Sequence, residues 1–408
     1  MGELEQLAQR MAEFLNPTAL RGVTRLLVMQ PTAFCNIDCD YCYLPNRTDR
    51  TTMPVETARE AARFIFDASL NAPDFTVVWH AGEPLVVQPQ WYRLAMAAMQ
   101  EVAPQGLGLP HAIQTNGMLI DEEWCDFFLE TGMRVGVSLD GPARLHNARR
   151  KTRSGQGTHG RVMRGIEQLQ RRGVPFHVIS VVGRPTLEAA DEFMDFFQSH
   201  GISNIGLNIE EIEGPVHTST LEADGSQQAF QTFFARVIER ASQAMPVIRL
   251  REREDLLACL ESPGFGTFGH NSQNVPFGIV TVSVRGELFT FSPELAGTTH
   301  ERFGDFGVGQ LPGASVDQIL VSPAFRAMWP EIEAGVKLCR ESCLYFDICL
   351  GGAPSNKLAE NGSFNSTETM HCRMSHQAVA DAVLADLEGR MPRFERAPAT
   401  AALDKISP

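Results

Sequence analysis

The chain has 408 residues, a formal charge of −14 and 43% hydrophobic residues. A chain of this length can bury one large core or two smaller ones without disulfides. Its excess of acidic residues argues against a sequence-independent nucleic-acid binder, whose affinity comes from Lys and Arg. No apolar stretch approaches the roughly 20 residues of a membrane span, and the first residues are acidic where a secretory signal is basic. We therefore expect a cytoplasmic protein with no nucleic-acid or membrane partner.

Short apolar runs alternate with helical patterns in the first half of the chain. Such runs are typical of parallel strands that are buried on both faces. They span residues 24–30, 75–80, 111–115, 134–139, 176–182 and 205–210. The helical segments between them span 55–70, 90–102, 121–132, 160–173 and 187–201, and the last three end on glycine. This alternation predicts an α/β fold whose parallel sheet is doubly covered or curled into part of a barrel.

The pattern changes after Gly214, and five segments are predicted. They are an N-terminal helix over 1–23, the parallel α/β domain over 24–214, a helical bridge and linker over 215–275, a second domain over 276–390 and a flexible tail over 391–408. The second domain opens with a β-hairpin, since Val280 and Val282 alternate with polar residues before a turn at Arg285-Gly286. Residues 330–375 are rich in Cys and Gly, which predicts irregular structure.

The nine cysteines are the main chemical signal, because clustered cysteines in a reducing compartment indicate metal ligands or catalytic thiols. Cys35, Cys39 and Cys42 follow the first predicted strand within one short loop. Structural zinc is one interpretation, but a closed zinc site needs a fourth ligand, and none lies nearby in sequence. Three thiolates would leave one iron of a [4Fe–4S] cluster open, and an open iron can chelate S-adenosylmethionine (SAM).

A second group of cysteines lies near the C-terminus. Its members are Cys339, Cys343, Cys349 and Cys372. Four ligands make a closed site, and their spacing alone fits zinc and an iron–sulfur cluster equally well. Cys125 lies in a helical segment and Cys259 near the end of another, and both are expected to be small buried side chains.

The first cysteine group resembles the signature of the radical SAM enzymes, a family built on a partial (β/α)6 TIM-like barrel. Three motifs at predicted strand ends resemble the SAM-binding segments of that family: Ala81 to Pro84, Thr115 to Gly117, and Ser138 to Gly141. The resemblance implies SAM contacts from Gly82, Glu83, Pro84 and Asn116, and ribose contacts from Ser138 and Asp140. A helix cap and an Asx turn are the alternatives for Ser138 and Asp140. Ala81 stands where the family pattern has glycine.

The second cysteine group on such a barrel resembles the C-terminal SPASM or twitch auxiliary-cluster domain. The full SPASM pattern has two further cysteines, at positions that hold Phe291 and Ala353 in this chain. The resemblance therefore implies two [4Fe–4S] clusters, not three: one that binds SAM on Cys35, Cys39 and Cys42, and one auxiliary cluster on the four C-terminal cysteines.

Residues 30–47 and 345–373 closely resemble the cyclophane-forming radical SAM/SPASM peptide maturases, notably those paired with glycine-rich-repeat precursor peptides. This resemblance implies an oxidoreductase that abstracts a β-hydrogen from a ribosomal precursor peptide with a leader and joins that carbon to an aromatic side chain. It also implies an electron donor such as flavodoxin or ferredoxin. The alternatives are thioether formation, sulfatase maturation and, from another class, a non-catalytic zinc-binding module.

The implied reaction needs a general base, and the sequence does not single one out. Glu210 and Asp347 are candidates by location, as are Glu211, Glu360 and Glu368. The leader is expected to pair with an exposed strand edge, such as that of the C-terminal hairpin.

Overall fold

The structure is a computed structural model that describes residues 18–261 and 270–390. Most of the predicted N-terminal helix over 1–23, residues 262–269 of the predicted linker and the predicted tail over 391–408 lie outside the described residues. Within the described ranges, none of the helices combines the length and the apolar character needed to cross a bilayer.

One ten-stranded sheet organises the molecule. In spatial order its strands are β12 (Gly309–Gln310), β11 (Glu287–Thr290), β10 (Ile279–Val282), β1 (Thr24–Met29), β3 (Asn71–Trp79), β4 (His111–Thr115), β5 (Arg134–Ser138), β7 (Phe176–Val182), β8 (Asn204–Ile209) and β9 (Arg249–Leu250). All neighbours from β10 to β9 are parallel, whereas β11 and β12 pair antiparallel. The predicted α/β fold with a parallel sheet is confirmed, and the six predicted apolar runs are β1, β3, β4, β5, β7 and β8.

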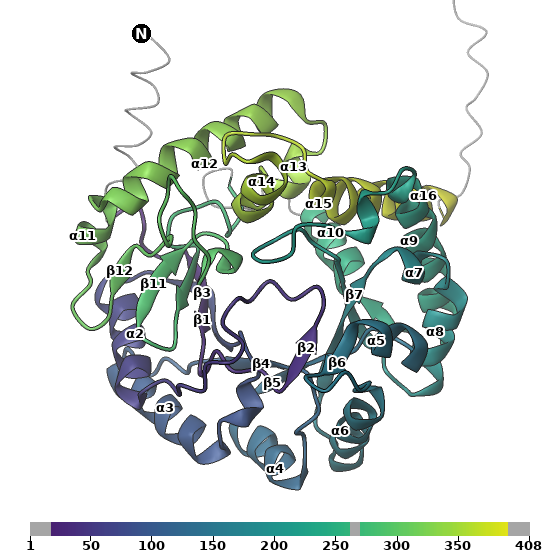
Figure 1. Cartoon of the computed structure of the whole chain (residues 1–408), viewed down its shortest axis with the longest axis horizontal. Coiled ribbons are helices and arrows are strands. Elements are labelled where there is room, and N and C mark those ends of the chain that lie inside the picture. Colours follow the sequence, from purple (N-terminus) through teal and green to yellow (C-terminus); the bar gives the residue numbers. More distant parts are fainter. Residues whose placement is uncertain (1–17, 262–269, 391–408) are drawn as a thin grey trace, which may run out of the picture.

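Helices connect the parallel strands, and most of them lie outside the strands in Figure 1. They are α2 (Val55–Asp67), α3 (Pro89–Val102), α4 (Glu122–Thr131), α5 (Ala143–Arg149), α6 (His159–Arg172), α7 (Arg184–Leu187), α8 (Ala190–Ser199), α9 (Ser226–Gln243) and α10 (Arg251–Glu261). The glycines predicted to end three of these helices, Gly132, Gly173 and Gly201, have φ values of 65°, 69° and 64°. A left-handed residue stops the helical hydrogen-bond pattern, so local sequence fixes these ends.

An aromatic layer joins the sheet to α3 beside the end of β3. Trp79 lies edge-on to Trp91 and Tyr92, with ring centroids 5.5 and 5.3 Å apart. The Tyr92 hydroxyl donates a hydrogen bond of 2.8 Å to the carbonyl of Pro84. The turn after β3 is therefore anchored in the core, where side chains have little freedom to move.

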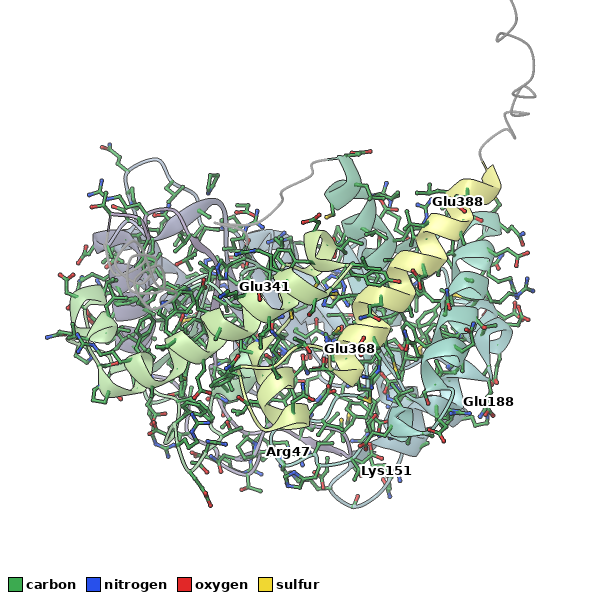
Figure 2. The ribbon with its side chains drawn as sticks, turned by 90° about the horizontal axis from the view of Figure 1, so that it is seen from above. Arg47, Lys151, Glu188, Glu341, Glu368 and Glu388 are labelled. Atoms are coloured by element: carbon green, nitrogen blue, oxygen red, sulfur yellow. The ribbon has the colours of Figure 1, made fainter. Side chains whose placement is uncertain are left out.

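The C-terminal region is helical, and the prediction that residues 330–375 are irregular was wrong. Its helices are α11 (Val316–Leu320), α12 (Pro323–Ser342), α13 (Phe346–Cys349), α14 (Pro354–Asn361), α15 (Met370–Cys372) and, after a π-helical turn, α16 (Val379–Arg390). The buried residues of α12 include Phe325, Trp329, Ile332 and Val336, which recur at helical spacing. Pro330 inside that helix obscures the pattern in the sequence. Figure 2 shows α12, with Glu341, and α16, with Glu388, along one side of the molecule.

The sheet is continuous across the boundaries that the sequence suggested. Strand β10 pairs in parallel with β1, with Leu26 opposite Ile279, so the hairpin after residue 276 extends the sheet of the first domain. Strand β9, from the predicted linker, extends the opposite edge beside β8. The outer edge of the hairpin is paired with β12 at Glu287 and Leu288, which covers part of the edge expected to receive a leader.

Candidate functional site

The first three cysteines lie together in the loop that follows β1. Cys35 and Cys39 are buried and Cys42 is half-buried, and all three are free thiols. The pKa of Cys35 is raised to about 12, chiefly by burial, with smaller contributions from the charges of Glu83 and Cys42. Burial likewise raises the pKa of Cys39 to about 12, although the charge of Arg150 acts to lower it, and the charges of Cys42 and Cys35 add to the rise. The charges of the three thiols thus affect one another's pKa, which indicates that the thiols are near one another.

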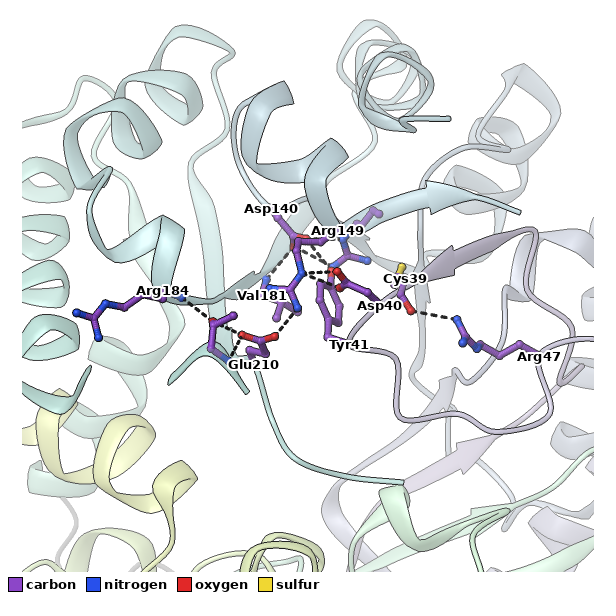
Figure 3. A network of polar contacts seen from close by, with 11 residues as sticks. Cys39, Asp40, Tyr41, Arg47, Asp140, Arg149, Val181, Arg184 and Glu210 are labelled. Atoms are coloured by element: carbon purple, nitrogen blue, oxygen red, sulfur yellow. Dashed lines mark hydrogen bonds and ion pairs between the residues drawn. The ribbon is translucent and has the colours of Figure 1, made fainter. Parts of the chain in front are cut away.

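Cations fix this loop through its backbone. Arg153 donates to the carbonyl of Cys35 at 2.9 and 3.1 Å. Arg47 donates to the carbonyl of Cys39 at 3.2 Å (Figure 3). A short strand in the loop, β2 (Ile37–Cys39), pairs antiparallel with β6 (Arg150–Thr152), which places Cys39 opposite Arg150. This two-stranded sheet was not predicted, because each strand has only three residues.

The turn after β3 packs against the cysteine loop. Gly82 has φ of 76°, and a Cβ there would lie 2.5 Å from the carbonyl oxygen of Thr32, so only glycine fits. The backbone N–H of Glu83 donates to the carbonyl of Phe34 at 2.8 Å. Among the residues expected to contact SAM, Gly82 and Glu83 therefore lie directly against the cysteine loop.

The Glu83 carboxylate links the ends of β3 and β4. It is 1% exposed and accepts hydrogen bonds from the Thr115 hydroxyl at 2.6 Å and the Asn116 N–H at 2.8 Å. Burial raises the pKa of Glu83 to about 6, although these hydrogen bonds act to lower it. The Asn116 amide lies 3.9 Å from the Cys35 sulfur. Two of the three motifs expected to bind SAM thus converge on one cysteine.

Ser138 and Asp140, expected at the ribose, differ in their surroundings. The Ser138 hydroxyl accepts a hydrogen bond of 3.0 Å from Gln114, and such a hydroxyl can still donate its own proton. Asp140 is 2% exposed and accepts from the Tyr41 hydroxyl at 2.6 Å, from Arg150 at 2.9 and 3.0 Å, and from the Val181 N–H at 2.9 Å. Four donors fill the acceptor sites of a carboxylate. This geometry counts against a ribose contact by Asp140. It also differs from the helix cap and the Asx turn that were the expected alternatives.

The Asp140–Arg150 pair is a buried ion pair beside the cysteine loop (Figure 3). Burial acts to raise the pKa of Asp140, but the charge and hydrogen bonds of Arg150 outweigh it and leave that pKa lowered. The carboxylate therefore stays ionised and orients Tyr41, which lies between Cys39 and Cys42 in the sequence. The pairing of Asp140 with Arg150 could not be predicted from the sequence, because it depends on where β6 places Arg150.

The two carboxylates expected to act as bases are poorly suited to that role. Glu210 is 4% exposed, pairs with Arg149 and accepts from the Thr220 N–H at 3.0 Å (Figure 3). Burial acts to raise the pKa of Glu210, yet its bonds to Arg149 and Thr220 leave it lowered. A carboxylate stabilised as an anion accepts a proton poorly. Asp347 is exposed on α13. Glu360 accepts from the backbone of Met370 and His371, which is a structural role.

A group of three carboxyls lies next to the cysteine loop, and only one of them, Glu211, was a candidate base in the sequence. Glu213 and Glu294 line a cavity of about 190 Å³ between the segment after β8, the turn η3 (Pro293–Leu295) and α14. Burial raises the pKa of Glu294 to about 7, and the charge of Glu211 adds to the rise. Burial and the same neighbour raise the pKa of Glu213 well above its ordinary value. We refer to Glu211, Glu213 and Glu294 as the carboxyl cluster.

The carboxyl cluster adjoins the third cysteine through Tyr43. Burial raises the pKa of Tyr43, and the charges of Glu294, Cys42 and Glu213 contribute. On the other side, the Asn356 amide of α14 donates to both Glu211 and Glu213 at 2.9 Å. A larger cavity of about 500 Å³ is lined by Glu60, Arg63 and Asp317 among others, but no cysteine lines it.

The four C-terminal cysteines come together from three helices. Cys339 lies in α12, Cys343 directly follows it, Cys349 ends α13 and Cys372 ends α15. Burial raises the pKa of Cys349, and the charges of Cys339 and Cys343 add to it. Burial raises the pKa of Cys372 to about 12, with contributions from Cys349 and Cys343. Helical packing thus assembles a set of four thiols that are dispersed in the sequence.

Both sets have the donor chemistry of iron–sulfur clusters, namely several buried thiols free of disulfides. In the described ranges, no three His, Cys, Asp or Glu side chains converge as the ligands of a single metal ion do. Phe291, at one of the positions where the full auxiliary pattern has cysteine, is fully buried and stacks on Trp329 with centroids 5.9 Å apart. That position is part of an aromatic core.

Comparisons with known proteins identify the class. A model of the radical SAM superfamily matches residues 29–197. An uncharacterized protein of Synechocystis sp., sll1766, is 39% identical over 371 residues, which cover 90% of this chain and 93% of that protein. The chain therefore belongs to the radical SAM superfamily.

Particular relatives are similar over parts of the chain or in fold. The serine-type anaerobic sulfatase-maturating enzyme of Bacteroides thetaiotaomicron is 34% identical over 179 residues, which cover 42% of this chain and 43% of that enzyme. The structure of anSMEcpe with bound AdoMet has a TM-score of 0.73 at 18% identity and covers 90% of this chain and 94% of that one. Streptococcus suis SuiB bound to precursor peptide SuiA has a TM-score of 0.58 at 16% identity, with 90% and 80% covered. At these identities the two structures show a shared fold.

Proposed function

We propose that this protein is a radical SAM peptide maturase with two [4Fe–4S] clusters, which removes a β-hydrogen from a ribosomal precursor peptide and forms a C–C crosslink to an aromatic side chain. The observation that carries the proposal is the presence of two separate thiol sets, one against the strand-end motifs and one in the C-terminal helices. Relatives of the same fold were solved with peptides bound: anSMEcpe with the Cp18Cys peptide and SuiB with SuiA.

The residues of the first set fit a cluster that binds SAM. Cys35, Cys39 and Cys42 would hold three irons, and bound SAM would supply the 5′-deoxyadenosyl radical that starts the reaction. Gly82 leaves room for close approach to the backbone, because it has no Cβ. Pro84 holds this turn to the core through Tyr92. Asn116 and Ser138 offer an amide and a hydroxyl at neighbouring strand ends, where parallel sheets bind ligands.

A peptide oxidation of this kind also releases a proton, and the carboxyl cluster suits its acceptance. A base works best when its pKa is near the working pH, and that of Glu294 is raised to about 7. Glu213 lies beside it in the same cavity, 4% exposed. We assign the base to this pair rather than to Glu210 or Asp347, since Glu210 is held as an anion by Arg149 and Asp347 is exposed.

Sulfatase maturation is the second candidate, favoured by the 34% identity to the serine-type enzyme over 179 residues. Phe291 and Ala353 count against the version with two auxiliary clusters, because they stand where the full pattern has cysteines. The two reactions also make chemically different products, so a single assay separates them.

The test is anaerobic incubation of reconstituted protein with SAM, a reductant such as reduced flavodoxin or ferredoxin, and synthetic peptides. One peptide is the glycine-rich product of a neighbouring reading frame, with its leader, and another carries a sulfatase-type serine. The crosslink predicts loss of two hydrogens from the first peptide, no reaction with an aldehyde reagent, and missing fragments between the joined residues in tandem mass spectra. Formation of an aldehyde on the second peptide supports sulfatase maturation. If SAM is cleaved while the masses of both peptides stay unchanged, both candidate functions are contradicted.

A further inference from the structure

A buried lysine contacts one of the C-terminal thiols. Lys357 in α14 is 4% exposed, and its Nζ lies 3.2 Å from the Cys339 sulfur and 2.9 Å from the Gly335 carbonyl oxygen. Lysine is rarely buried to this degree unless it is paired. The contact joins two helices, and its residues are 18 positions apart in the sequence, so helical spacing within one element does not predict it.

The packing around Lys357 is tight and specific. A Cβ at Gly335 would lie 2.1 Å from the carbonyl oxygen of Phe364 and 3.2 Å from the Lys357 Nζ. Glycine at this position therefore lets α12 lie close to the backbone at Phe364 and to the Lys357 amine. Of the other three cysteines, Cys372 has a neutral donor, the Gln377 amide, at 3.6 Å. At Cys339 the donor is an ammonium group.

The charge of a buried ammonium needs compensation. A carbonyl oxygen accepts a hydrogen bond but carries no net charge, whereas a cysteine thiolate carries one, and the thiolate is the form that binds a metal. An ammonium donor to a ligating sulfur also opposes the negative charge that a cluster gains when it accepts an electron. Hydrogen bonds to sulfur and nearby net charge are among the factors that set cluster potentials.

We propose that Lys357 is a positioning residue of the auxiliary site, which donates a charge-assisted hydrogen bond to Cys339 and raises the reduction potential of the cluster held there. This inference rests on the auxiliary cluster in the proposed function. The reaction concerned is the one-electron reduction of the cluster by an external donor such as dithionite, with no bond made or broken. The same helix carries Asn356, which binds Glu211 and Glu213, so α14 links the auxiliary site to the carboxyl cluster.

The experiment is a potentiometric titration of anaerobically reconstituted full-length protein, followed by electron paramagnetic resonance. A background of Cys35→Ala, Cys39→Ala and Cys42→Ala removes the first cluster, so that the signal comes from the auxiliary site alone. In that background, Lys357→Met removes both the charge and the donor, and Lys357→Gln keeps a donor without charge. Lys337→Met is the matched control, because Lys337 lies on α12 two residues before Cys339 but is 35% exposed and pairs with Glu341.

For Lys357→Met we expect a tenfold or larger weakening of the reduction equilibrium, which is a shift of about 59 mV to more negative potential for one electron. Lys357→Gln should give a smaller shift in the same direction, and Lys337→Met should leave the potential unchanged. If both Lys357 variants have the same potential as the background and each chain holds about four irons, the role of Lys357 is overturned but the auxiliary cluster is not. An iron content near zero in the background overturns the auxiliary cluster and the proposed function with it.

Discussion

The two cysteine sets differ in how positive charge meets them. At the first set, Arg47 and Arg153 donate to backbone carbonyls, and Arg150 pairs with Asp140 and acts on the Cys39 thiol through its charge, not through a hydrogen bond to the sulfur. At the second set, the Lys357 ammonium reaches a sulfur. The first set is therefore held mainly by fixing the path of a loop, and the second by direct contact with a ligand.

The sets also differ in what assembles them. One loop carries the first three cysteines, so a short sequence window suffices to find them. The second set depends on the packing of α12, α13 and α15, with α14 supplying Lys357. Substitutions around the first set should thus change the geometry of its loop. Substitutions around the second set should change the redox properties of the site.

The largest effect is expected from removing a ligand of either set. Cys42→Ala should abolish 5′-deoxyadenosine formation from SAM, because the first cluster loses one of its three thiolates. Cys343→Ala should abolish peptide modification while SAM cleavage continues. Chromatography of deoxyadenosine and mass spectrometry of the peptide measure the two. If Cys343→Ala still modifies the peptide fully, the second cysteine set is not needed for peptide modification.

The buried ion pair behind the first set should carry the next largest effect. Arg150→Met leaves Asp140 as an uncompensated buried carboxylate, and we expect a loss of about 3–5 kcal/mol in the free energy of unfolding. Arg144→Met, which breaks the exposed pair with Glu192, is the control and should leave the free energy of unfolding nearly unchanged. Urea denaturation measures both, and similar losses would contradict the assigned role of Arg150.

The same pair predicts a pH dependence. The pKa of Asp140 is lowered in the folded protein, chiefly because Arg150 outweighs burial. Its stabilisation is therefore complete above the ordinary aspartate pKa of about 4 and is lost as the pH falls below that value. Arg150→Met should weaken this acid sensitivity in denaturation curves between pH 5 and pH 3. If the loss of stability between pH 5 and pH 3 is the same in Arg150→Met, the ion pair is not the source of the acid sensitivity.

A smaller effect is expected at the turn that supports the cysteine loop. Gly82→Ala places a Cβ 2.5 Å from the Thr32 carbonyl oxygen at φ of 76°, so the loop must shift, at a cost of roughly 2–4 kcal/mol. Gly106→Ala is matched, since Gly106 has φ of 82° with open space around it, and should cost about 1–2 kcal/mol. Only Gly82→Ala should also lose iron from the first site. Equal iron contents would show that the loop tolerates the shift.

The smallest effect is expected in the carboxyl cluster between the two sets. Burial raises the pKa of Glu294 to about 7 from an ordinary value of 4.5, so the folded protein loses stability as the pH rises from about 4.5 to about 7. Glu294→Gln should remove this loss and raise the free energy of unfolding by about 1–3 kcal/mol at pH 8 but not at pH 4. Denaturation at the two pH values measures it, with exposed Glu188→Gln as the control. A gain at pH 4 as large as that at pH 8 would contradict the raised pKa.

Much of the fold could be predicted from sequence because its signals are local. Buried parallel strands such as β1 and β7 appear as continuous apolar runs, and Gly132 and Gly173 mark helix ends. Helix α12 was missed because Pro330 interrupts its pattern. The chain's membership of the radical SAM superfamily, which the first cysteines and strand-end motifs suggested, is confirmed by the comparisons.

The site was predictable only where its residues are close in the sequence. Asp140 was expected at a sugar, but β6 brings Arg150 to it across ten positions. Glu213 was not singled out, because its neighbours Glu294 and Asn356 come from distant segments. The partner of Lys357 lies on another helix. These contacts depend on tertiary packing, which spacing and composition do not encode.

The most direct test of the two-cluster account is the iron content of anaerobically reconstituted protein, with and without each cysteine set. We predict about eight irons per chain, and about four after removal of either set by alanine substitution, since each set is expected to hold one [4Fe–4S] cluster. About twelve irons would mean a third cluster. About four irons in the unaltered chain, with no change when Cys339, Cys343, Cys349 and Cys372 are removed, would contradict the auxiliary site.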